Sequence, residues 1–281
     1  MTSVDKIVVF WDNDGTLVES EKVAMKIAVK RAFEFLQRGS NGLATFTQDE
    51  VSHFVNKLMG RHLSQIINDI AQYLISSNRL SELPTEIEKA LYVRETFDVT
   101  VKALRKVDAV EGIPAIVDLL DDYAVPQYIV TSSERARVLP GLKRNVKFAQ
   151  VFDLENGLLS AGDDCSRKKP DPEVYLLAIH RWTQDGDFTI AIEDSQTGVE
   201  AAVAAGVDFV IGVSIATHIK HKDAHDRELV ASGADASVFD ARELKAMLTE
   251  ANRLRMRDNG KLKSALRAYA NELSLEPRNL A

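Results

Sequence analysis

The sequence predicts an α/β fold in which a parallel sheet is interrupted, early in the chain, by a long helical insertion. Short apolar runs such as Ile7–Trp11 and Phe188–Ile192 end abruptly in acidic residues, which is typical of strands buried on both faces of a parallel sheet. Helical patterns separate these runs, as βαβ units require. Between residues 21 and 108 the pattern is helical throughout.

The first strand organises the rest of the chain. Its five apolar residues, Ile7–Trp11, lead directly into Asp12, Asn13, Asp14 and Gly15. In open α/β sheets ligands bind beyond the carboxyl ends of the strands, so we expect the polar chemistry to begin here. If the extended geometry persists, Asp12 and Asp14 project to the same side. Gly15 then lets the backbone turn and approach a ligand closely.

The helical insertion, residues 21–108, is expected to form a domain with its own small core. Thr47–Glu50 and Thr85–Glu88 are capping boxes, in which threonine and glutamate satisfy each other's free backbone amides. The helix after the second box is expected to bury Ile87, Leu91, Phe97, Val101 and Leu104. Residues 1–20 and 109–245 are expected to form the core domain, and residues 246–281 a helical extension.

After residue 108 the alternation of strands and helices resumes. Together with the first strand, the runs Gln127–Val130, Phe188–Ile192, Phe209–Val213 and Ala236–Phe239 predict a sheet of about five parallel strands. Pro114 suits the first turn of a helix, and Asp171 with Pro172 predicts another helix that starts just after Lys169. Thr197–Glu200 is expected to cap the helix that follows the run Phe188–Ile192.

Composition limits the possible functions. The 281 residues, 45% of them hydrophobic and 27% charged, suffice for one large domain or a domain with a sizeable insertion. The net charge of -7 argues against a nucleic-acid partner. Cys165, the single cysteine, cannot form an internal disulfide, which fits a reducing cytoplasm. The first apolar run is too short for a signal peptide, and no run approaches the ~20 apolar residues of a membrane span.

The carboxylates after the first strand need a cation. At ~4 Å and an effective dielectric constant of ~20, each like-charge pair costs on the order of 4 kcal/mol, and a phosphate would add to the repulsion. Oxygen ligands suit Mg²⁺. Taken alone, Asp-x-Asp-Gly-Thr is equally consistent with a strand that ends in an acidic turn.

Three further signals stand at the ends of other predicted elements: Thr131-Ser132-Ser133, Lys168-Lys169-Pro170-Asp171-Pro172 and Glu193-Asp194-Ser195. Together with Asp12-Asn13-Asp14-Gly15-Thr16, their order and spacing resemble the haloacid dehalogenase-like superfamily, in its helical-cap branch of phosphatases and β-phosphoglucomutase-like proteins. The resemblance covers about residues 5 to 245. It implies a Rossmann-like, doubly wound parallel sheet as the core and an α-helical cap domain as the insertion.

The resemblance also implies catalytic roles. Asp12 would attack phosphorus and form an aspartyl-phosphate. Asp14 would protonate the leaving oxygen and then deprotonate the attacking water. Thr131 and Lys169 would bind the non-bridging phosphate oxygens, and Lys169 would also hold Asp12 in line. Without the family, Thr131 and the serines after it could simply cap the next helix.

Metal ligands follow from the same resemblance. Mg²⁺ would be held by the Asp12 side chain, the backbone carbonyl of Asp14 and Asp194, with Glu193 as a further ligand or as a support behind the ligands. Read without the family, Glu193 and Asp194 could merely end a strand. The expected substrate-binding residues are Gly15, Thr16, Ser132, Gly60, Arg61 and His62. The last three lie between two predicted cap helices, where a solvated turn is an equally good interpretation.

Departures from relatives narrow the reaction. Asp14 supplies an acid that dehalogenases and phosphonate-cleaving relatives lack. Leu63 stands where the phosphonate branch has a lysine, and Ala24 where β-phosphoglucomutases have a histidine. The expected function is a Mg²⁺-dependent phosphatase that hydrolyses a small phosphomonoester, such as a sugar phosphate or a phosphoglycolate-like metabolite. A phosphomutase and a non-catalytic phosphate-binding regulator remain alternatives. We expect a cytoplasmic monomer or homodimer without nucleic-acid or membrane partners.

Two features lie outside this pattern. His218, His221 and His225 have spacings that could gather a metal, but no cysteine or acid completes a site, so a solvated loop or helix start is favoured. The tail 252–281 carries seven Lys/Arg against three Asp/Glu. We expect it to be a solvated helix that packs back on the acidic body.

Overall fold

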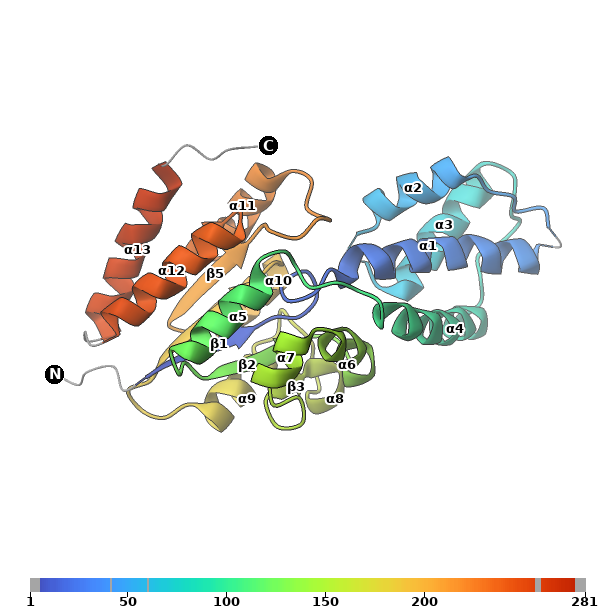
Figure 1. Cartoon of the computed structure of the whole chain (residues 1–281). Coiled ribbons are helices and arrows are strands. Elements are labelled where there is room, and N and C mark those ends of the chain that lie inside the picture. Colours follow the sequence, from blue (N-terminus) through green and yellow to red (C-terminus); the bar gives the residue numbers. More distant parts are fainter. Residues whose placement is uncertain (1–5, 41, 60, 256–258, 276–281) are drawn as a thin grey trace. The chain divides into compact units, whose positions relative to one another are not determined.

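The computed structural model describes residues 6–40, 42–59, 61–255 and 259–275 (Figure 1). The chain divides into two compact units. The core unit comprises Met1–Glu19 and Asp108–Ala281, and the helical unit comprises Ser20–Val107. Within the described residues, no helix has both the length and the apolar character needed to cross a membrane.

The core unit contains a six-stranded parallel sheet in the order β3-β2-β1-β4-β5-β6. The strands are β1 (Ile7–Trp11), β2 (Gln127–Thr131), β3 (Leu158–Ser160), β4 (Phe188–Glu193), β5 (Phe209–Val213) and β6 (Ala236–Val238). This sheet confirms the predicted Rossmann-like α/β class. The expectation of about five strands omitted β3, in which only Leu158 and Leu159 are apolar, too few for an apolar pattern to stand out from its surroundings.

The strand order positions the site. Successive strands progress outward in one direction from β1 to β3, and in the other from β4 to β6. Such a reversal between neighbouring strands opens a crevice at their carboxyl ends, where ligands bind in this class of sheet. Trp11 pairs in register with Ile129 of β2 and Ile192 of β4. Because of this register, the residues that follow β1, β2 and β4 emerge at one edge of the sheet.

Helices pack on both faces of this sheet. They are α5 (Ile113–Asp122), α6 (Arg135–Arg144), α7 (Val146–Val151), α8 (Ala161–Asp164), α9 (Glu173–Trp182), α10 (Gln196–Ala204), α11 (Lys222–Ala231), α12 (Ala241–Leu254) and α13 (Asn259–Leu275). Pro114 lies in the first turn of α5, as predicted. The α10 cap was predicted wrongly: Ser195 is the N-cap, and its hydroxyl accepts a hydrogen bond from the Gly198 amide. Serine and threonine are both good N-cap residues, so residue type alone did not decide between Ser195 and Thr197.

Alternate residues of β1 enter opposite cores. Val8 and Phe10 join the buried cluster that includes Tyr175 of α9. On the other face, the Trp11 indole Nε1 donates to Gln127 Oε1 at 3.0 Å, and Gln127 Nε2 donates to the Val117 carbonyl of α5 at 3.0 Å. The largest side chain of β1 is therefore buried with its polar atom satisfied, as a close-packed interior requires.

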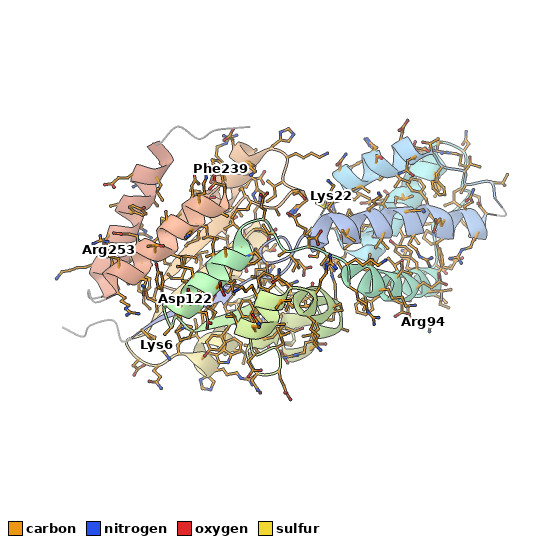
Figure 2. The ribbon with its side chains drawn as sticks, viewed as in Figure 1. Lys6, Lys22, Arg94, Asp122, Phe239 and Arg253 are labelled. Carbon is orange, nitrogen blue, oxygen red and sulfur yellow. The ribbon has the colours of Figure 1, made fainter. Side chains whose placement is uncertain are left out.

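The basic helix α13 packs against α12 and β6. Leu262 and Leu266 are buried. Lys263 Nζ lies 3.3 Å from Asp235 Oδ1, and Arg267 lies 2.5 Å from the same oxygen. Arg253 of α12, labelled in Figure 2, is exposed and pairs with Glu250 one turn earlier. Part of the tail's positive charge is thus neutralised by the core unit's own acids.

The helical unit consists of α1 (Ser20–Gly39), α2 (Gln48–Lys57), α3 (Leu63–Ser76) and α4 (Glu86–Leu104). Both predicted capping boxes are present, at Thr47 and at Thr85. An apolar core of its own lies between the helices. Its centre is aromatic, with Phe33 packed edge-on against Phe54 at 5.6 Å between ring centroids.

The predicted buried face of α4 was wrong in part: Leu104 is buried as expected, but Leu91 is exposed. Ile87 is 83% exposed, whereas Tyr92, Thr96 and Thr100 are buried. The Tyr92 hydroxyl donates to the Ala28 carbonyl at 2.8 Å, and the Thr100 hydroxyl donates to the Thr96 carbonyl at 2.8 Å. Backbone acceptors satisfy these hydroxyls, so polar residues occupy a helix face that an apolar pattern alone does not identify.

Glu50 links the first capping box to the end of α3. Its carboxylate accepts hydrogen bonds from the Tyr73 hydroxyl at 2.6 Å, from Arg79 at 2.7 Å and from the Thr47 amide at 2.7 Å. The hydrogen bond from Arg79 is the main cause that lowers the pKa of Glu50 to about 2. The ionised carboxylate is therefore more stable in the folded than in the unfolded chain.

We expect Glu50→Gln to destabilise the protein by about 1 kcal/mol at pH 7, which is less than the full pKa shift implies because water screens these partly exposed groups. Since the pKa is depressed on folding, the difference should persist above pH 4.5 and shrink as the pH falls toward 2. Urea unfolding between pH 7 and pH 3 measures it. Glu88→Gln, in the capping box without an arginine, is the matched control and should cost under ~0.5 kcal/mol. A pH-independent difference for Glu50→Gln would contradict the assignment.

Candidate active site

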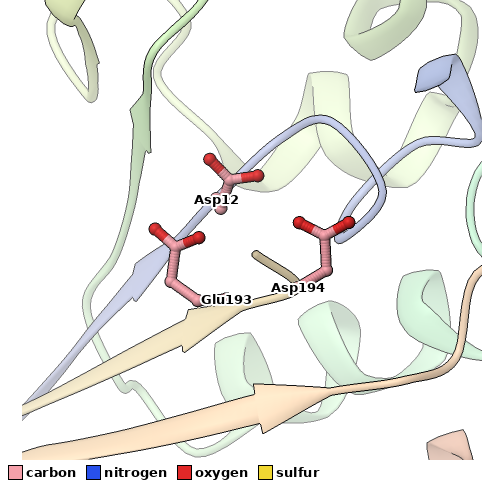
Figure 3. A group of neighbouring side chains, drawn as sticks. All are labelled: Asp12, Glu193 and Asp194. Carbon is pink, nitrogen blue, oxygen red and sulfur yellow. The ribbon is translucent and has the colours of Figure 1, made fainter. Parts of the chain in front are cut away.

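Three carboxylates meet where β1 and β4 end. Figure 3 shows Asp12 just beyond β1, and Glu193 and Asp194 at the end of neighbouring β4. One oxygen of each lies within 4.8 Å of one oxygen of each of the others. All three residues are buried, with Glu193 0% exposed. The Asp12 amide donates to the Ile192 carbonyl at 3.0 Å, which extends the β1–β4 pairing to the site itself. The sheet register therefore sets the spacing of the cluster.

Lys169 lies against this acid cluster, in the loop before α9. Its Nζ donates to Asp12 Oδ1 at 2.8 Å, to Glu193 Oε1 at 2.6 Å and to the Val130 carbonyl at 2.8 Å. The side chain is 3% exposed. An ammonium group has three N–H donors, and all three are used here. Lys169 is therefore fixed in place and orients one oxygen of Asp12.

Burial dominates the electrostatics of the cluster. It raises the pKa of Asp12, against the opposing effect of Lys169, and it raises the pKa of Glu193 to about 7. Burial alone would lower the pKa of Lys169, but Asp12 and Glu193 outweigh it, and the pKa of the ammonium rises. One fixed positive charge thus faces three carboxylates, and the site is short of positive charge.

A divalent cation fits this set of residues. The cluster offers only oxygen donors, the class that hard cations such as Mg²⁺ prefer. Within the described residues, Glu193 Oε2 is buried without a hydrogen-bond partner. Unsatisfied buried charge is costly unless it is paired or coordinates a metal. The donor chemistry and the deficit of positive charge both favour cation binding.

Asp14 is not one of the three clustered carboxylates, but its negative charge helps to raise the pKa of Asp12. β1 ends at Trp11, and the Asn13 carbonyl accepts the amides of Leu17 and Val18 in a turn, so the alternation expected for an extended chain does not continue to Asp14. Its Oδ2 accepts a hydrogen bond from the Ser133 hydroxyl at 2.7 Å, and Arg137 lies 3.6 Å from its Oδ1. Sequence reasoning missed both partners.

The hydroxyl residues after β2 form a turn. Thr131 is buried, and its Oγ1 accepts a hydrogen bond from the Ser133 amide at 3.1 Å. The alternative in which Thr131 caps the next helix does not apply, because Glu134 is the N-cap of α6. Ser132, between Thr131 and Ser133 in the sequence, is half-buried. The Thr16 hydroxyl oxygen is buried and has no hydrogen-bond partner among the described residues. Thr131 and Ser133 therefore reach the site from β2, next to β1.

Gly15 is where the backbone comes close to Asp194. It has φ +84°, and a Cβ there would lie 1.9 Å from Asp194 Oδ2 and 2.9 Å from His218 Cε1. His218 Nε2 lies 3.6 Å from Asp194 Oδ2, and the His218 side chain is only 11% exposed. The solvated loop expected for His218 was therefore wrong. The loop after β5 approaches the site, and Thr217 binds Glu19 through its amide and its hydroxyl.

The remaining predicted residues belong to the helical unit. Arg61 and His62 are exposed between α2 and α3, and His62 is the N-cap of α3. Gly60 lies outside the described residues. Their expected contact with substrate stays a prediction.

Comparisons with known proteins identify the family. A family model described as haloacid dehalogenase-like hydrolase matches residues 9–212. The chain belongs to this family. The match includes the last three residues of β1, the acid cluster and Lys169, and it confirms the resemblance inferred from the sequence motifs.

Relatives of this haloacid dehalogenase-like chain include named phosphatases. It is 26% identical over 246 residues to the validoxylamine A 7'-phosphate phosphatase of Streptomyces hygroscopicus subsp. limoneus, across 85% of this chain and 95% of that protein. It is 30% identical over 102 residues to a phosphorylated carbohydrates phosphatase of Thermotoga maritima, across 36% of this chain and 45% of that protein. Matches with that phosphatase and two Arabidopsis thaliana relatives each span less than half of the relative's length.

Solved structures of the family share the fold. A family hydrolase of Deinococcus radiodurans, with bound phosphate and sodium, aligns with a TM-score of 0.64 and 23% identity over 88% of this chain and 96% of that chain. A phosphonoacetaldehyde hydrolase-like protein of Oleispira antarctica aligns with a TM-score of 0.66 and 15% identity over 91% of this chain and 96% of that chain.

Substituting Gly15 tests the close approach of backbone and Asp194. We expect Gly15→Ala to cost about 1–2 kcal/mol through its positive φ and about 1–3 kcal/mol more through overlap with the Asp194 carboxylate. Gly206→Ala is the matched control, because Gly206 has φ +81° and open space where its Cβ would lie. Urea unfolding measures both variants. Equal losses of stability would show that Asp194 does not restrict position 15.

Proposed function

We propose that this protein is a Mg²⁺-dependent phosphatase that hydrolyses a small phosphomonoester through an aspartyl-phosphate on Asp12. One observation carries the proposal: a buried ammonium, Lys169, fixes Asp12 beside Glu193, with Asp194 completing an all-oxygen cluster. This arrangement offers a nucleophile, a fixed positive charge and a cation site at one point. Membership of a hydrolase family and the phosphatases among the relatives support it.

In the first half-reaction, a carboxylate oxygen of Asp12 attacks phosphorus and the bond from phosphorus to the leaving oxygen breaks. Asp14 gives its proton to that oxygen, so an alcohol leaves. Lys169 already binds Asp12 Oδ1, which leaves Oδ2 as the oxygen for attack. All three N–H donors of Lys169 bind protein acceptors. The proposed role of Lys169 in catalysis is therefore, first, to orient the nucleophile Asp12.

In the second half-reaction, water attacks the phosphorus of the aspartyl-phosphate. Asp14 accepts the proton from that water, the bond from phosphorus to Asp12 breaks, and inorganic phosphate leaves. The Ser133 hydroxyl and Arg137 contact the Asp14 carboxylate, so they support it in the form that accepts a proton. The Thr131 hydroxyl is proposed to donate to a non-bridging oxygen in both halves.

Asp12, Asp194 and the Asp14 carbonyl are the proposed Mg²⁺ ligands, and Glu193 supports them. When bound, the cation neutralises the repulsion between the cluster and the anionic substrate and stabilises charge on the phosphoryl oxygens. A sugar phosphate is the proposed substrate class, because several named relatives act on such molecules: a fructose-1-phosphate phosphatase and a hexitol phosphatase of Escherichia coli are examples. Arg61 and His62 are proposed to recognise the rest of the substrate.

The activity test is phosphate release from p-nitrophenyl phosphate and from a panel of sugar phosphates, with Mg²⁺ present. We expect turnover by the wild type and a loss of at least about a thousandfold in Asp12→Asn. Asp187→Asn is the matched control, since Asp187 is a buried aspartate at the opposite end of β4, paired with Lys6 at 3.4 Å. Its activity should stay within about twofold of the wild type.

An inactive wild type across the panel would overturn the phosphatase proposal. Isomerisation of a hexose 1-phosphate with a bisphosphate primer, faster than phosphate release, would replace it with a phosphomutase. Tight phosphate binding without turnover would favour a regulator.

Cation binding has a test that does not require turnover. At a Mg²⁺ concentration of about 100 times the dissociation constant, binding to the native state adds about 2.7 kcal/mol, which raises the unfolding temperature by several degrees. We expect this Mg²⁺-dependent rise in the wild type and in Asp187→Asn, and its loss in Asp194→Asn. An equal rise in Asp194→Asn, measured by scanning calorimetry, would contradict the proposed ligand.

A further inference from the structure

Tyr175 is a buried residue next to Lys169. It occupies the first turn of α9, which begins at Glu173, and it is 0% exposed. Lys169 Nζ stands 5.0 Å from the centroid of the tyrosine ring, a cation–π distance. The ring also packs against Phe10 of β1 at 6.2 Å between centroids. Tyr175 thus contacts both the charged group of the site and the strand that carries Asp12.

The Tyr175 hydroxyl is one of two hydrogen-bond donors to the same oxygen of Glu193. It donates to Glu193 Oε1 at 2.5 Å, and the same oxygen accepts from Lys169 Nζ at 2.6 Å. A hydrogen bond to an ionised acceptor is shorter and stronger than one between neutral groups. Two donors at one oxygen fix the position of that oxygen. Removing either donor would leave the buried carboxylate with one.

The other Glu193 oxygen is restricted by shape. A Cβ added at Gly198 of α10 would lie 1.9 Å from Glu193 Oε2, so that oxygen occupies space that a side chain would need. Tyr175 and Gly198 together confine the carboxylate from two sides. The resulting order of contacts runs from Tyr175 to Glu193, from Glu193 to Lys169, and from Lys169 to Asp12.

We propose that Tyr175 is a positioning residue for the Asp12 nucleophile, acting through Glu193 and Lys169. The inference rests on the proposed phosphatase function and adds a residue to it. Tyr175 does not touch the reacting atoms. Its hydroxyl keeps Glu193 Oε1 where it can hold Lys169, so that Lys169 presents Asp12 at a fixed angle. Small displacements of a nucleophile are costly: ~1 Å can slow a reaction about a hundredfold.

The test compares Tyr175→Phe with Tyr92→Phe. Both remove one hydroxyl from a fully buried ring that donates a single hydrogen bond, and Tyr92 lies in the core of the helical unit, where it bonds the Ala28 carbonyl. The loss in thermal stability should be the larger in Tyr175→Phe, because that hydroxyl donates to a carboxylate and the Tyr92 hydroxyl to a neutral carbonyl. We expect Tyr175→Phe to lower kcat for p-nitrophenyl phosphate about tenfold with KM changed less than about twofold. Tyr92→Phe should leave both constants within about twofold.

Crystal structures of the wild type and of Tyr175→Phe provide a readout independent of turnover. We expect the variant to lengthen the contact between Lys169 Nζ and Glu193 Oε1 and to reorient Asp12. An active wild type together with an unchanged kcat in Tyr175→Phe would overturn the positioning role. So would equal losses of kcat in the two variants, because loss of a buried hydrogen bond would then suffice. If the wild type has no phosphatase activity, the proposed function fails, and an unchanged site geometry in Tyr175→Phe then overturns the positioning role as well.

Discussion

The site depends on one buried ion contact, the ammonium of Lys169 between Asp12 and Glu193. Two acids at this distance without a cation would repel each other by several kcal/mol even at an effective dielectric constant of ~20. The positive charge of Lys169 offsets that repulsion. Its three N–H donors all bind fixed acceptors, so the ammonium group is also held in one position. The hydrogen bond to the neutral Val130 carbonyl does not neutralise charge; it fixes the position of the ammonium group. That third contact ties the ammonium to β2, the strand on the far side of β1.

The fold supplies the geometry of this contact without long loops. Asp12 directly follows β1 and Glu193 ends β4, and these neighbouring strands are in register over five residue pairs. Val130 belongs to β2, the strand on the other side of β1. Lys169 needs only to enter from the loop before α9. Because strands and register fix three of the four participants, one flexible side chain suffices to connect them. Preorganised charge of this kind favours catalysis because it costs no rearrangement during the reaction.

The sequence predicted the family, the α/β class and the four motif positions because apolar strands followed by polar residues are a strong local signal. It did not predict contacts that depend on packing between distant segments. Ser133, and not its neighbour Ser132, binds Asp14. The conformation of the turn after β2 determines which serine reaches Asp14, and the residue types alone do not. Tyr175 is not identified by any motif, and its hydrogen bond to Glu193 joins α9 to β4. His218 was taken for a solvated residue, although the loop after β5 brings it to Asp194. The roles of these residues in catalysis stay proposals.

Glycines complete the site by leaving space. Gly15 admits the Asp194 carboxylate, and Gly198 admits that of Glu193. β4 ends at Glu193, and Asp194 follows it, so the two side chains do not alternate as in a strand: both carboxylates join the cluster with Asp12 (Figure 3). Each of them still needs its own gap in a neighbouring element. One gap lies in the turn after β1 and the other in the first turn of α10. Since no larger residue fits either gap without moving a carboxylate, the acid cluster is fixed by backbone shape as much as by its hydrogen bonds. The register of β1 and β4 and these two glycines therefore set the spacing of the carboxylate oxygens together.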